Sequence, residues 1–306
     1  MPSSSQIQAA QKQIRPADYA MILATVVIWG GSFAATKLAL SQAEPMVVLF
    51  LRLAIGMPVL FIGVCLEGSL RLPTKGEALT LFLMGFQGIF FHQAIQSYAM
   101  KTAGAANANW MMIASPAIVA ILGRIFLKEK ISGSGICGLI LSAAGVVLVV
   151  GFGTVRTVAV SGFGSVGDLI MLFSVLNWAV FLVISRGALK TELPPAFVIF
   201  GEMFFSLISA AVFVYAIGSD FSTVPSFTLS TWAALIFLGA FSSALAYIFW
   251  FKALAAFPVT KVAVFQLLQP IAGVAIAYIL VGERFTIWLF AGGAMILSGV
   301  WLVSRK

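Results

Sequence analysis

The side chains with the capacity for chemistry are concentrated in one otherwise apolar segment, GFQGIFFHQAIQSYAM, which runs from Gly85 to Met100. Amide, imidazole and hydroxyl groups recur along it, at Gln87, His92, Gln93, Gln96, Ser97 and Tyr98. Such groups donate and accept hydrogen bonds, and the imidazole also titrates near neutral pH. Helical spacing puts a subset on one face: Gln87, Phe91, Ala94 and Tyr98. We expect the cluster to line a water-accessible cavity; the alternative is that it bonds helices together.

Further polar and aromatic side chains occur inside other apolar segments. Asn107 and Trp110 combine an amide with an aromatic wall, and Lys261 occupies the position equivalent to Asn107 in the second half of the chain. Tryptophans well inside such segments are poorly explained as anchors at a membrane surface. The candidate substrate-binding residues are therefore Trp29, Gln87, Phe91, His92, Tyr98, Asn107, Trp110, Asn177, Trp178, Tyr247, Lys261 and Gln269.

Several of these candidates have two interpretations. His92, the only histidine, is either a buried hydrogen-bond donor or a proton carrier. Lys261 either extends to the membrane surface or binds a substrate carboxylate. Pro116 and Pro270 lie inside apolar segments, where proline kinks a helix, and their matching positions favour gating or shaping of a cavity over a purely structural kink.

The elements that carry these residues are hydrophobic segments long enough to cross a bilayer. Hydrophobic residues make up 61% of the chain and charged residues 9%, whereas a soluble domain has roughly 25% charged residues. A spanning helix needs about 20 apolar residues. We predict an all-α polytopic membrane protein with ten transmembrane helices, at about 18–40, 46–66, 77–99, 103–127, 132–151, 167–188, 196–217, 230–252, 258–281 and 286–303.

The two halves of the sequence resemble each other. Adding 154 to the residue number superimposes Gly85 on Gly239 and Pro116 on Pro270, and SPAIVAILGRIFLKEK lies over QPIAGVAIAYILVGER. Each half has five segments, so the second copy must be inverted in the membrane, an arrangement typical of secondary transporters. The predicted units are a tail (1–17), a first five-helix repeat (18–151), a connecting loop (152–166), a second repeat (167–303) and a C-terminal end (304–306).

The positive charges predict the orientation. If the N-terminus is cytoplasmic, twelve Lys and Arg residues fall on the cytoplasmic side and four on the other. This bias places both termini in the cytoplasm. Arg52 and Glu202 lie inside segments, at corresponding places in the two repeats, and serve either as structural anchors or in transport.

Small residues are dense in the fifth and tenth segments, as GSGICGLILSAAG (133–145) and AGGAMILSG (291–299). Such residues let helices approach closely. We expect these two helices to serve in packing, with a homodimer through the glycine-rich faces as an alternative.

The sequence argues against several other classes of protein. It contains no nucleophile–base pair, carboxylate dyad or metal-ligand spacing, so we expect no enzyme, no metal and no cofactor. Its Gly-containing stretches do not match a phosphate-binding loop. The net charge of +8 reflects the membrane topology, and without a basic soluble module we expect no binding of nucleic acid.

The chain resembles the EamA-type branch of the drug/metabolite transporter superfamily. The resemblance rests on the proline followed 13 residues later by a glutamate in both repeats, and on WGGSFAATKLAL followed by PMVVLFLRLAIG. The resemblance covers residues 18–303. Within the superfamily, the chain is most similar to exporters of aromatic amino acids and metabolites in the bacterial inner membrane. It implies ten helices, alternating access and a central cavity lined mainly by helices one, three, four, six, eight and nine.

We therefore expect a secondary transporter that exports aromatic or neutral amino acids, or related small metabolites, across the inner membrane. A cavity with aromatic walls and a few amides suits a zwitterionic or neutral amphipathic solute. The main alternative is a broad-specificity drug efflux carrier of the same fold, which predicts an embedded acid that is nearly absent. The scarcity of carboxylates inside the apolar segments favours a facilitator driven by the substrate gradient, and proton antiport through His92 or Glu202 is the alternative. A channel would differ from a carrier in showing no saturable counterflow.

Overall fold

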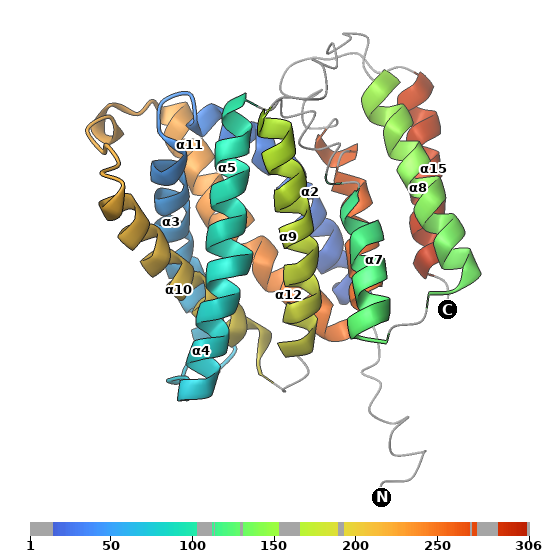
Figure 1. Ribbon diagram of the computed structural model, residues 1–306, viewed down its shortest axis with the longest axis horizontal. Helices are drawn as coiled ribbons and strands as arrows, with labels where there is room; N and C mark the ends of the chain where they lie inside the picture. The colour runs from blue at the N-terminus through green and yellow to red at the C-terminus, as the bar shows by residue number, and fades with distance from the viewer. Residues whose placement is uncertain are drawn as a thin grey trace, which may run out of the picture.

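The computed structural model describes residues 15–102, 112, 114–128, 131–152, 166–188, 193–269, 271–273 and 287–304 (Figure 1). All regular structure within these ranges is helical. The elements are α2 (Pro16–Ala39), α3 (Pro45–Leu66), α4 (Lys75–Met84), η1 (Gly85–Phe91), α5 (His92–Thr102), α7 (Ala114–Phe126), α8 (Gly133–Phe152), α9 (Val166–Ala188), α10 (Pro195–Ala216), η3 (Val224–Ser226), α11 (Leu229–Ile236), η4 (Phe237–Leu245), α12 (Ala246–Ala256), α13 (Val259–Phe265), η5 (Gln266–Leu268) and α15 (Ile287–Ser304).

The helix starts follow from local sequence. Proline occupies the first helical position of α2, α3 and α10, where the missing N–H would have no partner in any case. The side chain of Thr74 accepts a hydrogen bond from the backbone N–H of Glu77, and the Glu77 carboxylate accepts one from the backbone N–H of Thr74. This reciprocal pair caps α4. These caps place the start of each helix close to the start of the predicted apolar segment.

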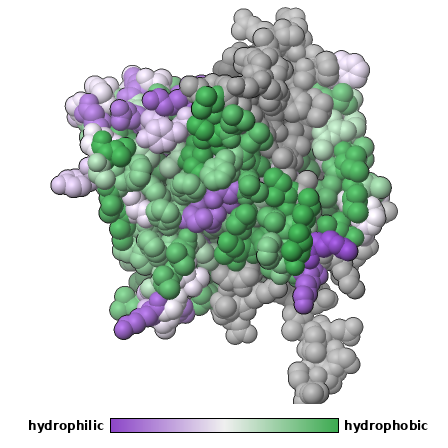
Figure 2. Space-filling view, in the orientation of Figure 1, coloured by the Kyte–Doolittle hydropathy of each residue, from purple (hydrophilic) through white to green (hydrophobic). Residues whose placement is uncertain are grey.

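Five helices within the described ranges are long and apolar enough to cross a bilayer: Pro16–Ala39, Pro45–Leu66, Lys75–Lys101, Pro195–Ala216 and Leu229–Ala256. At 1.5 Å per residue, about 20 residues span the hydrocarbon core. Figure 2 shows apolar side chains over the broad middle of one face, with polar ones gathered mainly towards its upper and lower edges. The protein is thus an all-helical, polytopic membrane protein, as the sequence predicts at this coarse level.

Two of the spanning helices contain a wide π-helical stretch. Lys75–Lys101 is made of α4, η1 and α5, and Leu229–Ala256 of α11, η4 and α12. A π turn inserts extra residues per turn and rotates the faces that follow it. The face expected from regular spacing is divided: Ala94 is 8% exposed, whereas Phe91 and Tyr98 are 36% and 39% exposed. Because Ala94 and Tyr98 both lie in α5, η1 changes their orientation relative to Gln87 but does not separate them from each other.

The glycine-rich helices α8 and α15 pack against each other within one chain, side by side at one edge of the molecule (Figure 1). A Cβ atom added to Gly138 would lie 2.6 Å from the carbonyl oxygen of Gly299, and one added to Gly145 would lie 2.6 Å from that of Gly292. The close approach therefore requires glycine at these positions. These two helices therefore serve in packing, and because their glycine faces are buried inside the chain, they give no support to the alternative of a homodimer contact.

Two further close contacts join the halves of the chain. A Cβ added to Gly239 in η4 would lie 2.8 Å from the carbonyl oxygen of Arg52 in α3, and one added to Gly85 would overlap the carbonyl oxygen of Glu202 in α10. α3 thus packs on η4, and α10 packs on η1. These contacts hold the π-helical stretches beside the centre of the molecule, where the candidate site lies.

Candidate functional site

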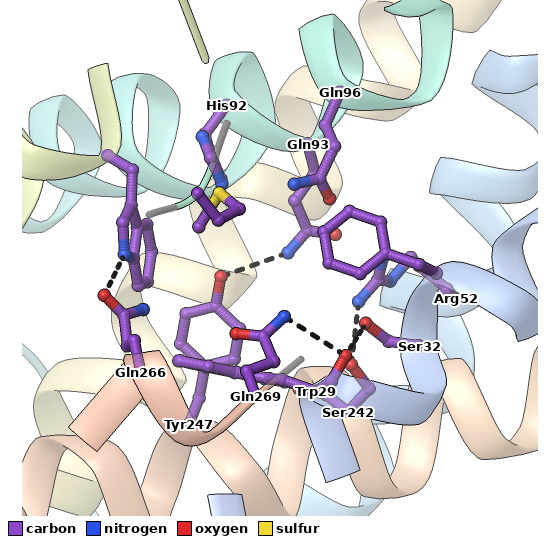
Figure 3. Close-up of a pocket in the computed structure, with 13 residues that line it drawn as sticks. Trp29, Ser32, Arg52, His92, Gln93, Gln96, Ser242, Tyr247, Gln266 and Gln269 are labelled. Atoms are coloured by element: carbon purple, nitrogen blue, oxygen red, sulfur yellow. Dashed lines mark hydrogen bonds between the residues drawn. The ribbon is translucent and has the colours of Figure 1, made fainter. Parts of the chain in front are cut away.

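An internal cavity opens between helices from both halves of the chain (Figure 3). The space open to the centres of water molecules is about 40 Å³, enough for a few waters. Its lining comes from α2, α3, α5, α9, η4, α12 and the segment around η5, and consists of Trp29, Ser32, Phe33, Arg52, His92, Gln93, Gln96, Met112, Trp178, Ser242, Tyr247, Gln266 and Gln269.

Aromatic rings form one wall of the cavity, with Trp29 of α2 at their centre. The Trp29 ring lies 5.6 Å from that of Trp178, 5.3 Å from Tyr247 and 4.9 Å from Trp250, measured between centroids. The edge-to-face arrangements with Trp178 and Tyr247 match the quadrupoles of the rings. The indole N–H of Trp29 donates to the carbonyl oxygen of Ser242 at 3.1 Å, which fixes the ring orientation.

Arg52 of α3 brings a positive charge to the cavity. Its side chain donates through Nε to Ser243 Oγ at 2.7 Å and through Nη2 to Ser242 Oγ at 3.3 Å, and the residue is 6% exposed. Among the described residues, no carboxylate oxygen lies within 4.0 Å of the guanidinium. A buried cation held only by hydroxyl groups retains unused hydrogen-bond donors.

Four glutamine side chains, Gln93, Gln96, Gln266 and Gln269, supply the amides. Gln93 Nε2 donates to the Tyr247 hydroxyl at 3.3 Å, and Gln266 Oε1 accepts from Trp178 Nε1 at 3.4 Å. The other polar end of each of these two amides is buried and has no hydrogen-bond partner. Buried polar atoms are normally paired, so these free ends are suited to a ligand or to ordered water.

His92 of α5 is buried beside the aromatic wall. Its ring stacks on Trp178 with centroids 5.0 Å apart, and its Nδ1 lies 3.0 Å from Ser174 Oγ and 3.2 Å from the Ser174 carbonyl oxygen. Both contacts are satisfied by a proton on Nδ1. The ring is therefore held as a hydrogen-bonded part of the wall.

Five of the twelve candidate residues line this cavity: Trp29, His92, Trp178, Tyr247 and Gln269. Gln87 and Asn177 instead bond to each other between η1 and α9, at 2.7 Å from Gln87 Nε2 to Asn177 Oδ1 and 3.1 Å from Asn177 Nδ2 to the Gln87 carbonyl oxygen. Such reciprocal bonds join helices. Phe91 contacts Phe173 at 6.2 Å between centroids and, like Tyr98, is exposed on the outer surface.

The remaining candidates lie elsewhere. Lys261 donates to the Tyr19 hydroxyl at 3.1 Å and sits over the rings of Tyr19 and Phe257, 5.5 and 5.2 Å from their centroids. Pro116 is buried near the start of the described part of α7. Three candidates are outside the described residues: Asn107, Trp110 and Pro270.

Eight lining residues are not among the twelve named candidates: Ser32, Phe33, Arg52, Gln93, Gln96, Met112, Ser242 and Gln266. Two of them, Gln93 and Gln96, belong to the polar cluster that is expected from the sequence to line a cavity as a whole. One signal for Gln93 was present in the sequence, because Gln93 and Tyr247 are separated by the same 154 residues that relate the two halves. Arg52 carried the signal of a charge inside an apolar segment. The small residues Ser32 and Ser242 carried none.

We expect Asn177→Ala to lower stability without changing substrate affinity. The substitution removes two of the hydrogen bonds between Gln87 and Asn177, each worth about 1 kcal/mol. The measurement is the midpoint of thermal unfolding in detergent together with the KM for exchange in vesicles. A raised KM with unchanged unfolding would contradict a purely packing role for the pair.

The described lining groups suit binding of a solute more than bond-making chemistry. They include one cation, one imidazole, four amides and several rings, but no carboxylate and no thiol. Nucleophilic catalysis requires a nucleophile next to a base. Of the two lining serines, Ser242 accepts a hydrogen bond from Arg52 and Ser32 donates to the carbonyl oxygen of Trp29. The fold and cavity define a polytopic membrane protein with a small cavity, lined by polar and aromatic side chains, between its helices.

Comparison with known proteins identifies the family. The model of the EamA-like transporter family matches residues 18–151 and 165–305. The chain therefore belongs to the EamA-like transporter family, which confirms the resemblance noted in the sequence and means that the protein is a transporter and not an enzyme.

Individual relatives align over nearly the whole chain. An uncharacterized transporter of Archaeoglobus fulgidus is 29% identical over 286 residues, covering 94% of this chain and 96% of that protein. The uncharacterized transporter YyaM of Bacillus subtilis is 26% identical, covering 92% of each. A probable amino-acid metabolite efflux pump of Salmonella typhimurium is 26% identical, covering 93% of this chain and 94% of the relative. A solved crystal structure with 19% identity has the same fold, with a TM-score of 0.78 over 95% of this chain and 99% of that one.

Proposed function

We propose that this protein is a secondary transporter that exports aromatic or neutral amino acids, or related small metabolites, across the plasma membrane by alternating access around the cavity. The observation that carries the proposal is the position of the cavity between corresponding parts of the two halves. Gln93 and Tyr247, which are 154 residues apart and equivalent in the repeats, bond to each other in its wall. Transporters with inverted repeats bind substrate at such an interface.

Other contacts support an inverted repeat of two five-helix units with ten spans. Ser142 donates to the carbonyl oxygen of Ile296, again 154 residues away. A residue that contacts its own equivalent marks a pseudo-two-fold axis. In this arrangement both termini are cytoplasmic, as the distribution of Lys and Arg favours, and Pro116 and Pro270 occupy equivalent places from which to shape the cavity.

The small size of the cavity indicates that the protein must change conformation to admit a substrate. The open space of about 40 Å³ is far below the roughly 300–1,000 Å³ of pockets that bind small molecules. An amino acid with an aromatic side chain therefore enters only if the two halves separate on one side. Alternating access supplies such a separation, and we assign the structure to a conformation with a contracted cavity.

The composition of the wall and one relative support the substrate class. Aromatic rings at Trp29, Trp178 and Tyr247 suit an apolar side chain, and the free amide ends suit its polar groups. The Salmonella typhimurium relative carries the name of a probable amino-acid metabolite efflux pump. A broad drug efflux carrier remains the alternative, but the described lining has no carboxylate to attract lipophilic cations.

The test is counterflow in proteoliposomes. Vesicles loaded with unlabelled L-phenylalanine are offered labelled L-phenylalanine at low concentration, with no proton or sodium gradient. We expect transient, saturable accumulation of label that is blocked by excess L-tryptophan. Empty vesicles and vesicles loaded with glucose are the controls. Accumulation of a lipophilic cation but of no amino acid would overturn the proposed substrate class and favour drug efflux.

A further inference from the structure

Resting on the proposed function, we propose that Arg52 and Gln93 form a binding pair for a zwitterion, in which the guanidinium holds the carboxylate of the substrate and the free amide oxygen accepts a hydrogen bond from its ammonium group. The pair limits the substrate to solutes with a carboxylate, of which α-amino acids satisfy both partners. It also distinguishes the two carrier functions, because a fixed cation in the cavity repels a cationic drug.

The first argument concerns the charge of Arg52. The residue is 6% exposed, it lines the cavity, and among the described residues it has hydroxyl partners only. A guanidinium has five N–H donors in a planar fork that matches a carboxylate. Two donors bind Ser242 and Ser243, and these bonds fix the plane of the fork. A buried cation without a counter-charge is costly in free energy. An incoming carboxylate would supply that counter-charge.

The second argument concerns the unpaired acceptor at Gln93, which is 3% exposed. Its Nε2 is engaged by the Tyr247 hydroxyl, so Oε1 is the free end, and this oxygen is buried without a partner. Figure 3 shows the side chains of Arg52 and Gln93 on neighbouring parts of the cavity wall, beside the rings. An α-amino acid carries its carboxylate and ammonium group on one carbon, so it needs a donor and an acceptor close together.

The third argument excludes the other intramembrane cation for this role. Lys261 donates to Tyr19 and lies over two aromatic rings, and it is not one of the residues that line the cavity. A substrate with several negative charges, such as a sugar phosphate, needs more than one cation. The cavity has a single guanidinium among its described lining residues, which fits one carboxylate.

A purely structural role for Arg52 makes a different prediction. Arg52 also links α3 to η4 through the two serines, so any substitution there weakens that contact. Loss of structure lowers uptake of all substrates alike. A binding role changes the ratio between a substrate with a carboxylate and its analogue without one, and this ratio is the decisive measurement.

The experiment compares L-phenylalanine, L-phenylalaninamide and 3-phenylpropionate as competitors of labelled L-phenylalanine in counterflow. The full chain is tested as wild type, Arg52→Gln, Arg52→Lys and Gln93→Leu. Arg71→Gln is the matched control, because Arg71 is exposed and bonded to Glu77 outside the cavity. Where a variant no longer exchanges label, the same three ligands are ranked by the rise in unfolding temperature that they cause in detergent, since ligand binding stabilises the folded protein.

In the wild type we expect phenylalanine to compete at least about 10-fold better than the amide, as loss of one charge-assisted hydrogen-bond pair implies. Arg52→Gln should bring that ratio close to one, Arg52→Lys should restore part of it, and Arg71→Gln should leave it unchanged. Gln93→Leu should instead remove the preference for phenylalanine over 3-phenylpropionate.

Two results would overturn the assignment. If the wild type prefers the free amino acid and Arg52→Gln keeps this preference, the pair is wrong while amino-acid export stands. If the wild type exchanges the amide and lipophilic cations but no carboxylate, the pair and the proposed function fail together.

Discussion

Trp29→Ala is expected to abolish exchange of aromatic amino acids and to destabilise the protein by about 3–5 kcal/mol, the usual cost of removing a buried aromatic ring. Trp29 is 8% exposed and touches three other rings, at Trp178, Tyr247 and Trp250. Its removal leaves a void in the aromatic wall of the cavity. It also removes a ring that packs against Tyr247, whose hydroxyl accepts a hydrogen bond from Gln93. The measurements are counterflow of labelled phenylalanine and thermal unfolding in detergent.

Two control variants separate the contributions of Trp29. Trp29→Phe keeps a ring but loses the hydrogen bond to the Ser242 carbonyl oxygen, so exchange should persist with a raised KM. Trp301→Ala removes a tryptophan that is 53% exposed on α15, and it should leave exchange close to the wild-type level. Full exchange by Trp29→Ala at the wild-type KM would show that the rings are not part of the substrate path.

The helical architecture could be predicted because it depends on length and hydropathy, which are local properties. An apolar segment of about 20 residues has few alternatives to a helix in a bilayer, since its backbone groups must bond within the segment. Prolines at the starts of α3 and α10 and the capping pair at Thr74 and Glu77 then fix where helices begin. The family resemblance rested on motifs that cover the same segments, and the family match confirms it.

The direction in which individual side chains point could be predicted only in part. Trp29 and Trp178 line the cavity as expected because aromatic residues deep in a span have few other roles. A regular helical period puts Phe91 and Tyr98 on the face of Gln87, but the π-helical stretch η1 changes the period between Gln87 and α5, and both residues are exposed. A change of period depends on tertiary packing, in this case of Gly85 on α10, and single-sequence spacing does not contain it.

The cavity role of Arg52 could be recognised only from its partners. The sequence shows a charge inside a span but gives no means of deciding whether a carboxylate, a hydroxyl or lipid surrounds it. The structure places Ser242 and Ser243, residues about 190 positions away in the chain, against the guanidinium. The glycine faces of α8 and α15 illustrate the same limit: their spacing predicts close packing, but whether the partner lies in the same chain depends on the tertiary arrangement.

A large effect on folding is also expected from adding a single methyl group where the two halves meet. Gly85→Ala places a Cβ on the backbone oxygen of Glu202, and Gly239→Ala places one 2.8 Å from the backbone oxygen of Arg52. Because backbone atoms cannot move aside by changing a rotamer, the helices themselves must separate. We expect each substitution to cost about 3 kcal/mol, at the upper end of the usual range for overpacking, and to reduce the yield of folded protein.

The comparison of the two variants tests the inverted repeat as well as the packing. Gly85 and Gly239 are equivalent residues in the proposed repeats, so their substitutions should lower the unfolding temperature by similar amounts although they lie in different halves. Gly76→Ala is the matched control, since Gly76 lies on the same long helix as Gly85 and a Cβ there meets nothing within 4 Å. A loss at Gly85 without one at Gly239 would indicate that the halves do not pack equivalently. Equal decreases in the unfolding temperature for Gly85→Ala and Gly239→Ala, with exchange retained by Gly76→Ala, would support two equivalent contacts between the halves. The halves would then move about these two contacts during transport.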